Sequence, residues 1–533
     1  MGLLLLILWA CGTTQSQSPE GPLRIGMRRP PDSLNPYLSM TVEGEYIAAR
    51  LFPRLYREEP RLKDGIPELT PYLAAGHSWN AEGTVLSLSL KPDLHWQDGT
   101  PLTAEDVAYS FDLQKDPEVA WLSSGSKDRI EGWKVLSATE IEVTFKHASP
   151  MNLLDVNEGF IVPRHHFSKW PVAAWPERDW AQDLVVYGPY RIKSFDAERL
   201  LLTGVAAGAV PDAGFAFVRE KETLFQLLLN HSLDFSWTLP VERIPEIEAK
   251  LAPAIYDDLT FAFIAWNPIQ PEAFSQNKPG DVAALLALKR DAPHPLFADE
   301  RVRKAMTFAM RREHYQRQFW YGRSSVPVSP WSSGLAYYKG QLEPRSYDPQ
   351  EAERLLNEAG WLLEGTQRVK DGRPFRFSVI SVAGSAIREQ YLLAIQQDLR
   401  GLGIEMEVDV QEASRYVSNI NGRQFDAVFG IFRAGTRPDL SSLFHSREAL
   451  DSGANYASWT EADLLLDEVA QARTVADLSP ALLALERLFF EQQPMTMLYK
   501  GQTVGASSST VLKPRFNYLD PLFLLEQWNH AVH

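Results

Sequence analysis

The sequence predicts an α/β fold, because segments with the period of a helix alternate with segments with the period of a strand. Apolar residues occupy every second position over residues 85–90 and 140–145, as in half-buried strands. Residues 302–310 carry apolar side chains at helical spacing, and residues 391–399 repeat that pattern directly before the alternating segment 404–410. A chain of 533 residues is too long for one hydrophobic core, so about two to four domains are expected.

The first clearly bounded helix follows a turn. Asp98-Gly99-Thr100-Pro101 has the composition of a turn and lies between the first two predicted strands. Thr103 is the expected N-cap of the next helix, and Asp106 can return its hydrogen bond from the third helical position. Val107 and Phe111 belong to the apolar side of this helix.

Two later helices have equally clear limits. Asp348 is expected to cap a helix that holds Pro349 in its first turn and ends at Gly360. The helix over residues 391–399 should stop near Gly401, and a strand follows at once. Helix followed by strand, repeated along the chain, supports the α/β class.

The N-terminus has the pattern of an export signal. An apolar run over residues 3–10 precedes Cys11 and is too short to span a membrane, which needs roughly 20 apolar residues. Leu8-Trp9-Ala10-Cys11 resembles the bacterial lipobox, in which the cysteine is diacylated and becomes the mature N-terminus. We therefore expect a lipoprotein signal peptide over residues 1–11, lipidation at Cys11 and a flexible tether over residues 12–21.

Composition and motifs exclude several classes of protein. The single cysteine excludes an internal disulfide and any zinc or iron–sulfur site built from several cysteines. A formal net charge of -15 disfavours nucleic-acid binding, which needs a basic surface. The sequence has no Gly-x-Ser-x-Gly elbow, no P-loop, no His-Glu-x-x-His and no Gly-x-Gly-x-x-Gly. We therefore expect that the protein is not an enzyme, uses no cofactor and has no nucleic-acid partner.

Residues 90–107 read LKPDLHWQDGTPLTAEDV, and this block resembles the strand–turn–helix stretch of the bacterial extracellular solute-binding proteins of family 5. That family contains oligopeptide, dipeptide and nickel binders. Further matches occur in the family's order, with SLNP at 33–36, YGPY at 187–190, FADERVRKA at 297–305, LGI at 402–404 and NY at 455–456. Each match is weak alone, but together they span about residues 22–500, and their order makes the resemblance specific.

The resemblance implies a two-lobed fold like that of periplasmic binding proteins, of the large type II cluster with an extra subdomain in lobe I. Lobe I would span residues 22–268, with the inserted subdomain at about 60–180. Lobe II would span residues 269–490, and residues 491–533 would return to lobe I. The crossings would lie near Asn267-Pro268 and Gln493-Pro494, and ligand between the lobes would favour their closed arrangement.

The resemblance also implies where a ligand's amino group would bind. In peptide-binding members an aspartate of lobe II pairs with that group, and the matching stretch here is FGIFRAGTRPD, residues 429–439. The anchor position falls on Gly435 or Thr436, and neither is acidic. Because an unpaired buried charge costs about 3–5 kcal/mol, either another carboxylate binds the amine or the ligand has no amine at that point.

Arginines flank this position instead. Arg433 and Arg437, with Phe432 beside them, are candidate ligand contacts, and their guanidinium groups would suit an acidic, phosphorylated or sugar-bearing group. The alternative is an exposed pair of arginines on a loop. In dipeptide binders another arginine precedes a lobe II helix and binds the ligand carboxylate, and Arg388 lies a turn or more beyond the matching position here.

The remaining ligand-binding candidates lie on segments that face the cleft in relatives, or, for Trp331, on a lobe II segment that could present an indole to the ligand. They are Asp32, Asn35, Trp331, Asn455 and Tyr456. For each, an ordinary turn or packing role is an alternative. His165-His166 does not predict a metal site, because adjacent side chains point apart and no third ligand is evident.

The sequence therefore predicts a monomeric, lipid-anchored binding protein at the cell surface or in the periplasm. It would capture an oligopeptide or a peptide-like solute and deliver it to the permease subunits of an ABC importer. Alternatives are a ligand such as an oligosaccharide, an opine or a sugar phosphate, or a sensory binding protein that docks on a membrane receptor.

Overall fold

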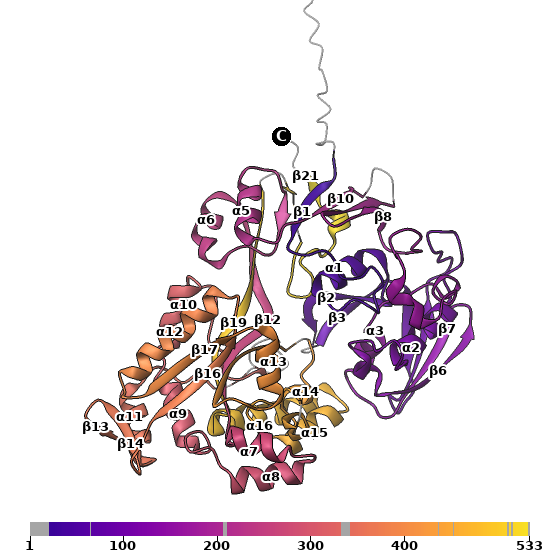
Figure 1. Cartoon of the computed structure of the whole chain (residues 1–533). Coiled ribbons are helices and arrows are strands. Elements are labelled where there is room, and N and C mark those ends of the chain that lie inside the picture. Colours follow the sequence, from indigo (N-terminus) through magenta and orange to yellow (C-terminus); the bar gives the residue numbers. More distant parts are fainter. Residues whose placement is uncertain are drawn as a thin grey trace, which may run out of the picture.

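The computed structural model describes residues 21–63, 66–205, 210–331, 340, 342–434, 436–450, 452–508, 511–512 and 515–530. It has two lobes, which lie side by side and are joined by a pair of long strands (Figure 1). The predicted signal peptide, Cys11 and all but the last residue of the predicted tether lie outside the described residues, as does Gly435. None of the described helices has the length and apolar character that a membrane span requires.

A mixed sheet of ten strands runs through both lobes and confirms the α/β class. From the lobe II edge to the lobe I edge, its order is β17 (Glu405–Gln411), β16 (Arg376–Val382), β18 (Ala427–Arg433), β12 (Ala252–Trp266), β19 (Met495–Ser507), β11 (Phe235–Ser236), β1 (Leu23–Met27), β10 (Ala213–Phe217), β9 (Arg199–Gly204) and β8 (Tyr190–Phe195). β16 pairs in parallel with β17 and β18, whereas β12 and β19 are antiparallel.

Strands β12 and β19 connect the lobes, and their pairing is interrupted by a bulge. The register shifts between residues 257 and 261, and Leu259 there has a positive φ of 63°. Asp258 Oδ1 accepts hydrogen bonds from the backbone N and the hydroxyl of Thr260, at 3.0 and 2.6 Å. A Cβ on Gly501 would lie 1.7 Å from Thr260 Oγ1, so the bulge requires glycine at that position of β19.

The predicted crossings lie close to the ends of the same strands. Asn267-Pro268 follows the last residue of β12, and Gln493-Pro494 precedes the first residue of β19. The residues of β12 from Thr260 onward already pair with β18, inside lobe II. The predicted domain limits remain predictions.

Lobe I contains a separate four-stranded sheet, which lies to the right in Figure 1. Its order is β4 (Ala74–Trp79), β5 (Val85–Leu90), β7 (Glu140–Phe145) and β6 (Ile130–Ser137). Helix α2 (Ala104–Lys115) packs against it, and both hydrogen bonds of the predicted capping box between Thr103 and Asp106 are present. The predicted strands at 85–90 and 140–145 are confirmed as β5 and β7.

Lobe I also contains smaller elements. They are α1 (Val42–Leu51), the hairpin of β2 (Tyr56–Lys63) and β3 (Ile66–Pro71), α3 (Asn152–Asn157) and α4 (Arg164–Phe167). Helices α5 (Lys221–Leu229) and α6 (Ile244–Lys250) lie at the top of the molecule in Figure 1.

Lobe II surrounds its part of the sheet with helices. They are α7 (Pro271–Asn277), α8 (Val282–Asp291), α9 (Glu300–Phe308), α10 (Arg312–Phe319), α11 (Pro349–Glu358), α12 (Ala386–Arg400), α13 (Ala413–Asn421), α14 (Ser441–Phe444), α15 (Asp463–Gln471) and α16 (Val475–Gln492). The apolar face predicted from Val302 to Met310 is buried. Asp348 caps α11 as predicted, since its Oδ1 accepts from Glu351 N at 2.9 Å.

Candidate functional site

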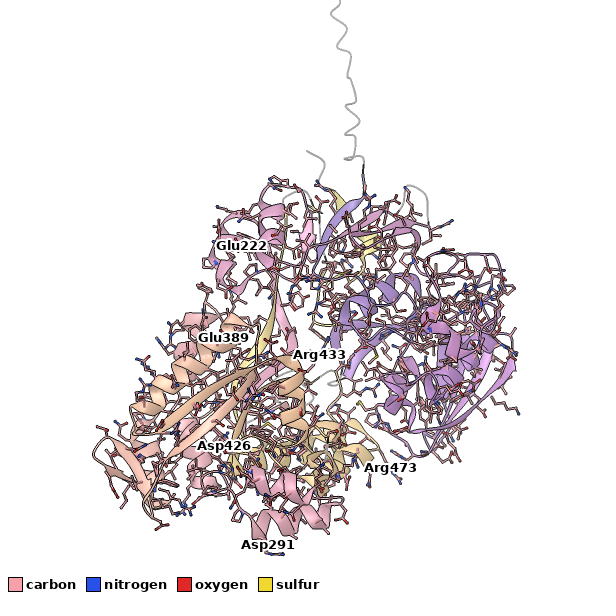
Figure 2. All side chains as sticks on the ribbon, viewed as in Figure 1. Glu222, Asp291, Glu389, Asp426, Arg433 and Arg473 are labelled. Carbon is pink, nitrogen blue, oxygen red and sulfur yellow. The ribbon has the colours of Figure 1, made fainter. Side chains whose placement is uncertain are left out.

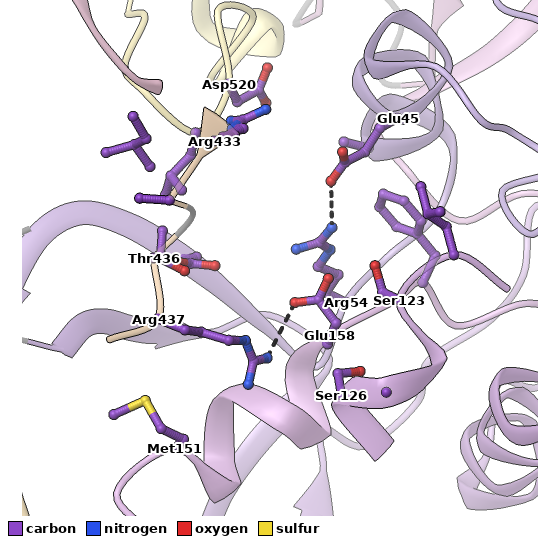
Figure 3. A pocket seen from close by; sticks show the side chains of 18 of the residues that line it. Glu45, Arg54, Ser123, Ser126, Met151, Glu158, Arg433, Thr436, Arg437 and Asp520 are labelled. Carbon is purple, nitrogen blue, oxygen red and sulfur yellow. Dashed lines mark hydrogen bonds and ion pairs between the residues drawn. The ribbon is translucent and has the colours of Figure 1, made fainter. Parts of the chain in front are cut away.

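A cavity of about 890 Å³ lies between the lobes. Lobe I lines it from helix α1, strand β2, the region before and after α3, and the C-terminal return. Lobe II lines it with the segment that follows β18 and with helix α14. Figure 3 shows that Arg433, Thr436 and Arg437 extend along one side of this space, opposite Glu45, Arg54 and Glu158.

Aromatic packing holds the lobe II wall in place. Trp331 Nε1 donates to the carbonyl of Pro438 at 3.1 Å, and this indole also packs against Phe444. Phe432 lies on Phe263, with 4.8 Å between ring centroids, and on Tyr456, with 5.3 Å. The segment that carries the cavity arginines is therefore fixed from behind by rings that do not line the cavity.

One ion-pair network joins the lobes. Arg437 of lobe II pairs with Asp155 and, at 3.5 Å, with Glu158, both of lobe I. Arg129 binds the two oxygens of Asp155 at 2.7 and 3.0 Å. The Asp155 side chain is fully buried, so the two arginines must offset the cost of removing its negative charge from water.

Burial and charge act in opposite directions on this network. Burial alone would raise the pKa of Glu158, but the charges of Arg54 and Arg437 outweigh it and lower the pKa. Burial lowers the pKa of Lys127 to about 7, against the opposing charges of Glu158 and Asp155. Lys127 Nζ donates to the backbone carbonyls of Asp155 and Glu158 rather than to a carboxylate.

A second group of charges lies around the start of strand β2. Arg54 Nη2 lies 3.2 Å from Glu45 Oε1, and its guanidinium lies 4.7 Å from the centre of the Phe160 ring. Glu58 is half-buried in the cavity wall. Its Oε1 is inaccessible to solvent and has no hydrogen-bond partner among the described residues. Burial raises the pKa of Glu58, although Arg54 acts against this rise.

At the other end of the cavity, Arg433 is exposed and its Nη2 donates to the carbonyl of Tyr518 at 3.3 Å. Asp520 nearby is paired with Arg50. Figure 2 shows Arg433 near the middle of the molecule, whereas Asp291 lies at the outer end of lobe II. Arg433 thus contacts the C-terminal return of lobe I across the cavity.

The structure places two of the predicted ligand contacts, Arg433 and Arg437, in the cavity wall. Phe432, Trp331 and Tyr456 lie behind that wall. Asn455 is fully buried and its amide donates to the carbonyls of Phe444, His445 and Trp459, which gives it a packing role. A contact between these residues and a ligand stays a prediction.

The other predicted contacts lie outside the cavity lining. Asp32 accepts hydrogen bonds from Ser39, Met40 and Thr41 and so orders the turn before α1. Asn35 is buried and accepts from Tyr37 N at 3.0 Å. Arg388 donates to the carbonyl of Val382 at 3.0 Å and lies near the Phe429 ring.

Metal ligands do not gather in the described part of the chain, where no group of three or more His, Cys, Asp and Glu side chains could hold an ion. His165 Nε2 lies 2.7 Å from Asp98 Oδ2, and His166 packs against Trp170.

The lobe I charges were not predicted as ligand contacts. They are Glu45, Arg54, Glu58, Asp155 and Glu158. A local signal exists for part of this set: Arg54, Tyr56 and Glu58 are spaced by two residues, so a strand would place them on one face. No periodic signal connects them with Asp155 and Glu158, which are a hundred residues away in sequence.

Two lobes enclosing a charged cavity of this size define a solute-binding protein. The profile described as bacterial extracellular solute-binding proteins, family 5 Middle, matches residues 68–449, and the chain belongs to that family. It is therefore a binding protein and not an enzyme.

Individual relatives are distant but cover most of the chain. The oligopeptide-binding protein AppA of Bacillus subtilis (strain 168) is 22% identical over 475 residues, 84% of this chain and 81% of that protein. The nickel-binding periplasmic protein of Escherichia coli (strain K12) is 26% identical over 417 residues, 75% of this chain and 72% of that protein. The structure of AppA from Bacillus subtilis in complex with a nonapeptide has a TM-score of 0.73 at 21% identity and covers 96% of this chain and 99% of its own. This likeness shows that the two-lobed fold was predicted correctly.

Proposed function

We propose that this chain is the substrate-binding protein of an ABC importer and captures a peptide or a peptide-like solute between its lobes. The observation that carries the proposal is the cavity of about 890 Å³, to which both lobes contribute charged side chains. This volume lies within the range of roughly 300–1,000 Å³ found for small-molecule sites. A binder that closes around its solute needs groups on both lobes, because only the closed arrangement then satisfies all contacts.

The class of solute is supported by the relatives. AppA is named for oligopeptides, and the other relative is named for nickel. Neither name favours the sugar, opine or sugar-phosphate alternatives. The mixture of arginines and carboxylates in the cavity suits a solute with charges of both signs, as a peptide has.

The direct test is native mass spectrometry of the protein purified from the cell envelope, followed by tandem sequencing of released molecules. We expect peptide masses. A mixture of di- to pentapeptides added to ligand-free protein should raise the melting temperature, because a ligand at 100 times its Kd adds about 2.7 kcal/mol. No released peptide and no thermal shift would contradict the proposal.

We also propose that the protein is exported and anchored through a lipid on Cys11, which the lipobox-like sequence supports. Labelled palmitate should be incorporated into the chain, and Cys11→Ser should abolish the label and release the protein from membranes. Label retained by the variant would refute this anchor.

Delivery to a permease has its own test. Deleting the gene should abolish uptake of the identified peptide. A sensory protein would form the same complex with ligand, but its deletion would leave uptake unchanged.

A further inference from the structure

Glu58 in the cavity wall has one carboxylate oxygen, Oε1, that is inaccessible to solvent and has no hydrogen-bond partner among the described residues. Glu58 also forms no ion pair within the described part of the chain, whereas Glu45, Asp155 and Glu158 each pair with an arginine. A buried carboxylate oxygen without a hydrogen-bond partner is costly unless a donor or a cation reaches it.

The nearest arginines are already committed to other groups. Arg54 lies 3.2 Å from Glu45. Arg437 pairs with Asp155 and Glu158. These arginines lower the pKa of Glu58 by their charge, but burial, the largest effect, keeps the pKa raised. An additional positive charge at this point would therefore be bound favourably.

The position of Glu58 also suits contact with a solute. It lies on β2, two residues from Tyr56, and both side chains line the cavity. Directly beyond it the pairing of β2 with β3 shifts register between Glu58 and Leu62. Across the cavity, the hydroxyl of Thr436 from lobe II interacts with the same carboxyl. A group bound there would touch both lobes.

We infer that Glu58 binds a cationic group of the solute, an ammonium or a guanidinium, from lobe I. Thr436 contributes a hydroxyl from lobe II at the position where an acidic anchor is absent. The solute thus brings the charge that the cavity itself does not supply to Glu58. This inference rests on the proposed function as a peptide binder.

The test uses two probes and two variants of the full-length protein. The probes are a mixture of tri- to pentapeptides with free amino termini and lacking Lys and Arg, and the same mixture after N-acetylation. The variant Glu58→Gln keeps the shape of the side chain and removes its charge. Its matched control is Glu59→Gln, because Glu59 is the next residue of β2, lies outside the cavity lining and accepts from Thr70 Oγ1 at 2.8 Å.

We expect the wild-type protein and Glu59→Gln to bind the free peptides, and both to bind the acetylated mixture more weakly. Glu58→Gln should bind the free peptides roughly 10- to 100-fold more weakly than the wild type, as expected for the loss of a charge-assisted contact, and should no longer distinguish the two mixtures. The melting temperature of ligand-free Glu58→Gln should not fall, since the carboxylate forms no ion pair in the described part of the chain and the amide oxygen of Gln can still accept from Thr436.

The outcomes separate the inference from the proposed function. If the free peptides bind, but neither acetylation nor Glu58→Gln weakens binding, the inference is overturned and the peptide-binding function stands. If neither mixture binds the wild type, the proposed peptide function fails, and the inference fails with it. A loss of binding in Glu59→Gln equal to that in Glu58→Gln would also overturn the assignment.

Discussion

The two walls of the cavity are built in different ways. Lobe I presents its charges on or beside regular elements, with Glu45 on α1, Glu58 on β2 and Glu158 directly after α3. Lobe II presents Arg437 on an irregular segment beyond the end of β18. That segment is held by the Trp331 indole and by packed rings rather than by strand pairing.

This difference in local structure suggests that the two walls have different roles in binding. Groups on helices and strands keep a more exact geometry than groups on loops, so lobe I is the wall suited to selecting a solute. The lobe II segment pairs with lobe I only through side chains such as Arg437, which suits this wall to making and breaking contact as the lobes move. Changes in lobe I should therefore affect stability and selectivity, and changes in lobe II should affect closure.

The largest effect is expected from Asp155→Asn. This change removes the fully buried carboxylate that faces Arg129 and Arg437, so Arg129 loses its carboxylate partner and Arg437 keeps only Glu158. Breaking such a buried pair costs about 3–5 kcal/mol, and the lower end applies because both arginines are partly exposed. Urea unfolding should show a reduced free energy of unfolding for the variant.

Asp128→Asn is the matched control, because Asp128 lines the same cavity but is exposed. Its unfolding free energy should remain within about 0.5 kcal/mol of the wild-type value. Equal losses in both variants would mean that the Asp155 pairs do not stabilise lobe I.

The fold could be predicted further than the site. Local patterns were sufficient for β5, β7 and the cap of α2, because hydrogen bonds and burial there involve residues close in sequence. The pairing of β12 with β19 could not be read from such patterns, since it joins residues more than two hundred positions apart. The bulge at Leu259 depends on that pairing and on Gly501.

At the site, Arg433 and Arg437 were found because the family resemblance marked their segment, and the structure places both in the cavity wall. Phe432 and Trp331 came from the same reasoning but lie behind the wall, because a strand alternates its faces and an indole can support a loop without reaching the solute. Glu58 was missed because its importance comes from a carboxylate oxygen that is buried without a partner among the described residues, which is a property of three-dimensional packing.

The next largest effect is expected from Arg437→Gln, which removes the ion pairs that join the lobes. Because Arg437 and Glu158 are partly exposed and Asp155 keeps its pair with Arg129, the ion pairs of Arg437 should stabilise the closed arrangement by about 1 kcal/mol, roughly a fivefold change in the population of closed molecules. Small-angle X-ray scattering of ligand-free protein should give a larger radius of gyration for the variant.

Arg447→Gln is the control for this experiment. Arg447 also lines the cavity from lobe II, but it lies 3.5 Å from Glu448 of its own lobe. Its radius of gyration should match that of the wild type. If Arg437→Gln matched it too, the pairs with Asp155 and Glu158 would have no role in closure.

The smallest effect is expected in the pH dependence of the free energy of unfolding, through Glu158. Its folded pKa lies below the usual range because Arg54 and Arg437 outweigh the effect of burial, so the unfolded chain takes up a proton first as the pH falls. The contribution of Glu158 to stability is therefore complete above about pH 5 and is lost as the pH falls through the lowered pKa. Urea unfolding at pH 6 and pH 4 should show that the wild type exceeds Glu158→Gln in free energy of unfolding by a smaller amount at pH 4. The decrease should be a few tenths of a kcal/mol, since partial exposure screens the pairs.

The control repeats the measurement with Arg437→Gln present in both proteins. The decrease between pH 6 and pH 4 should then be smaller, because part of the pKa shift of Glu158 disappears with Arg437. An unchanged difference between pH 6 and pH 4 would show that Glu158 gains nothing from the lobe II arginine.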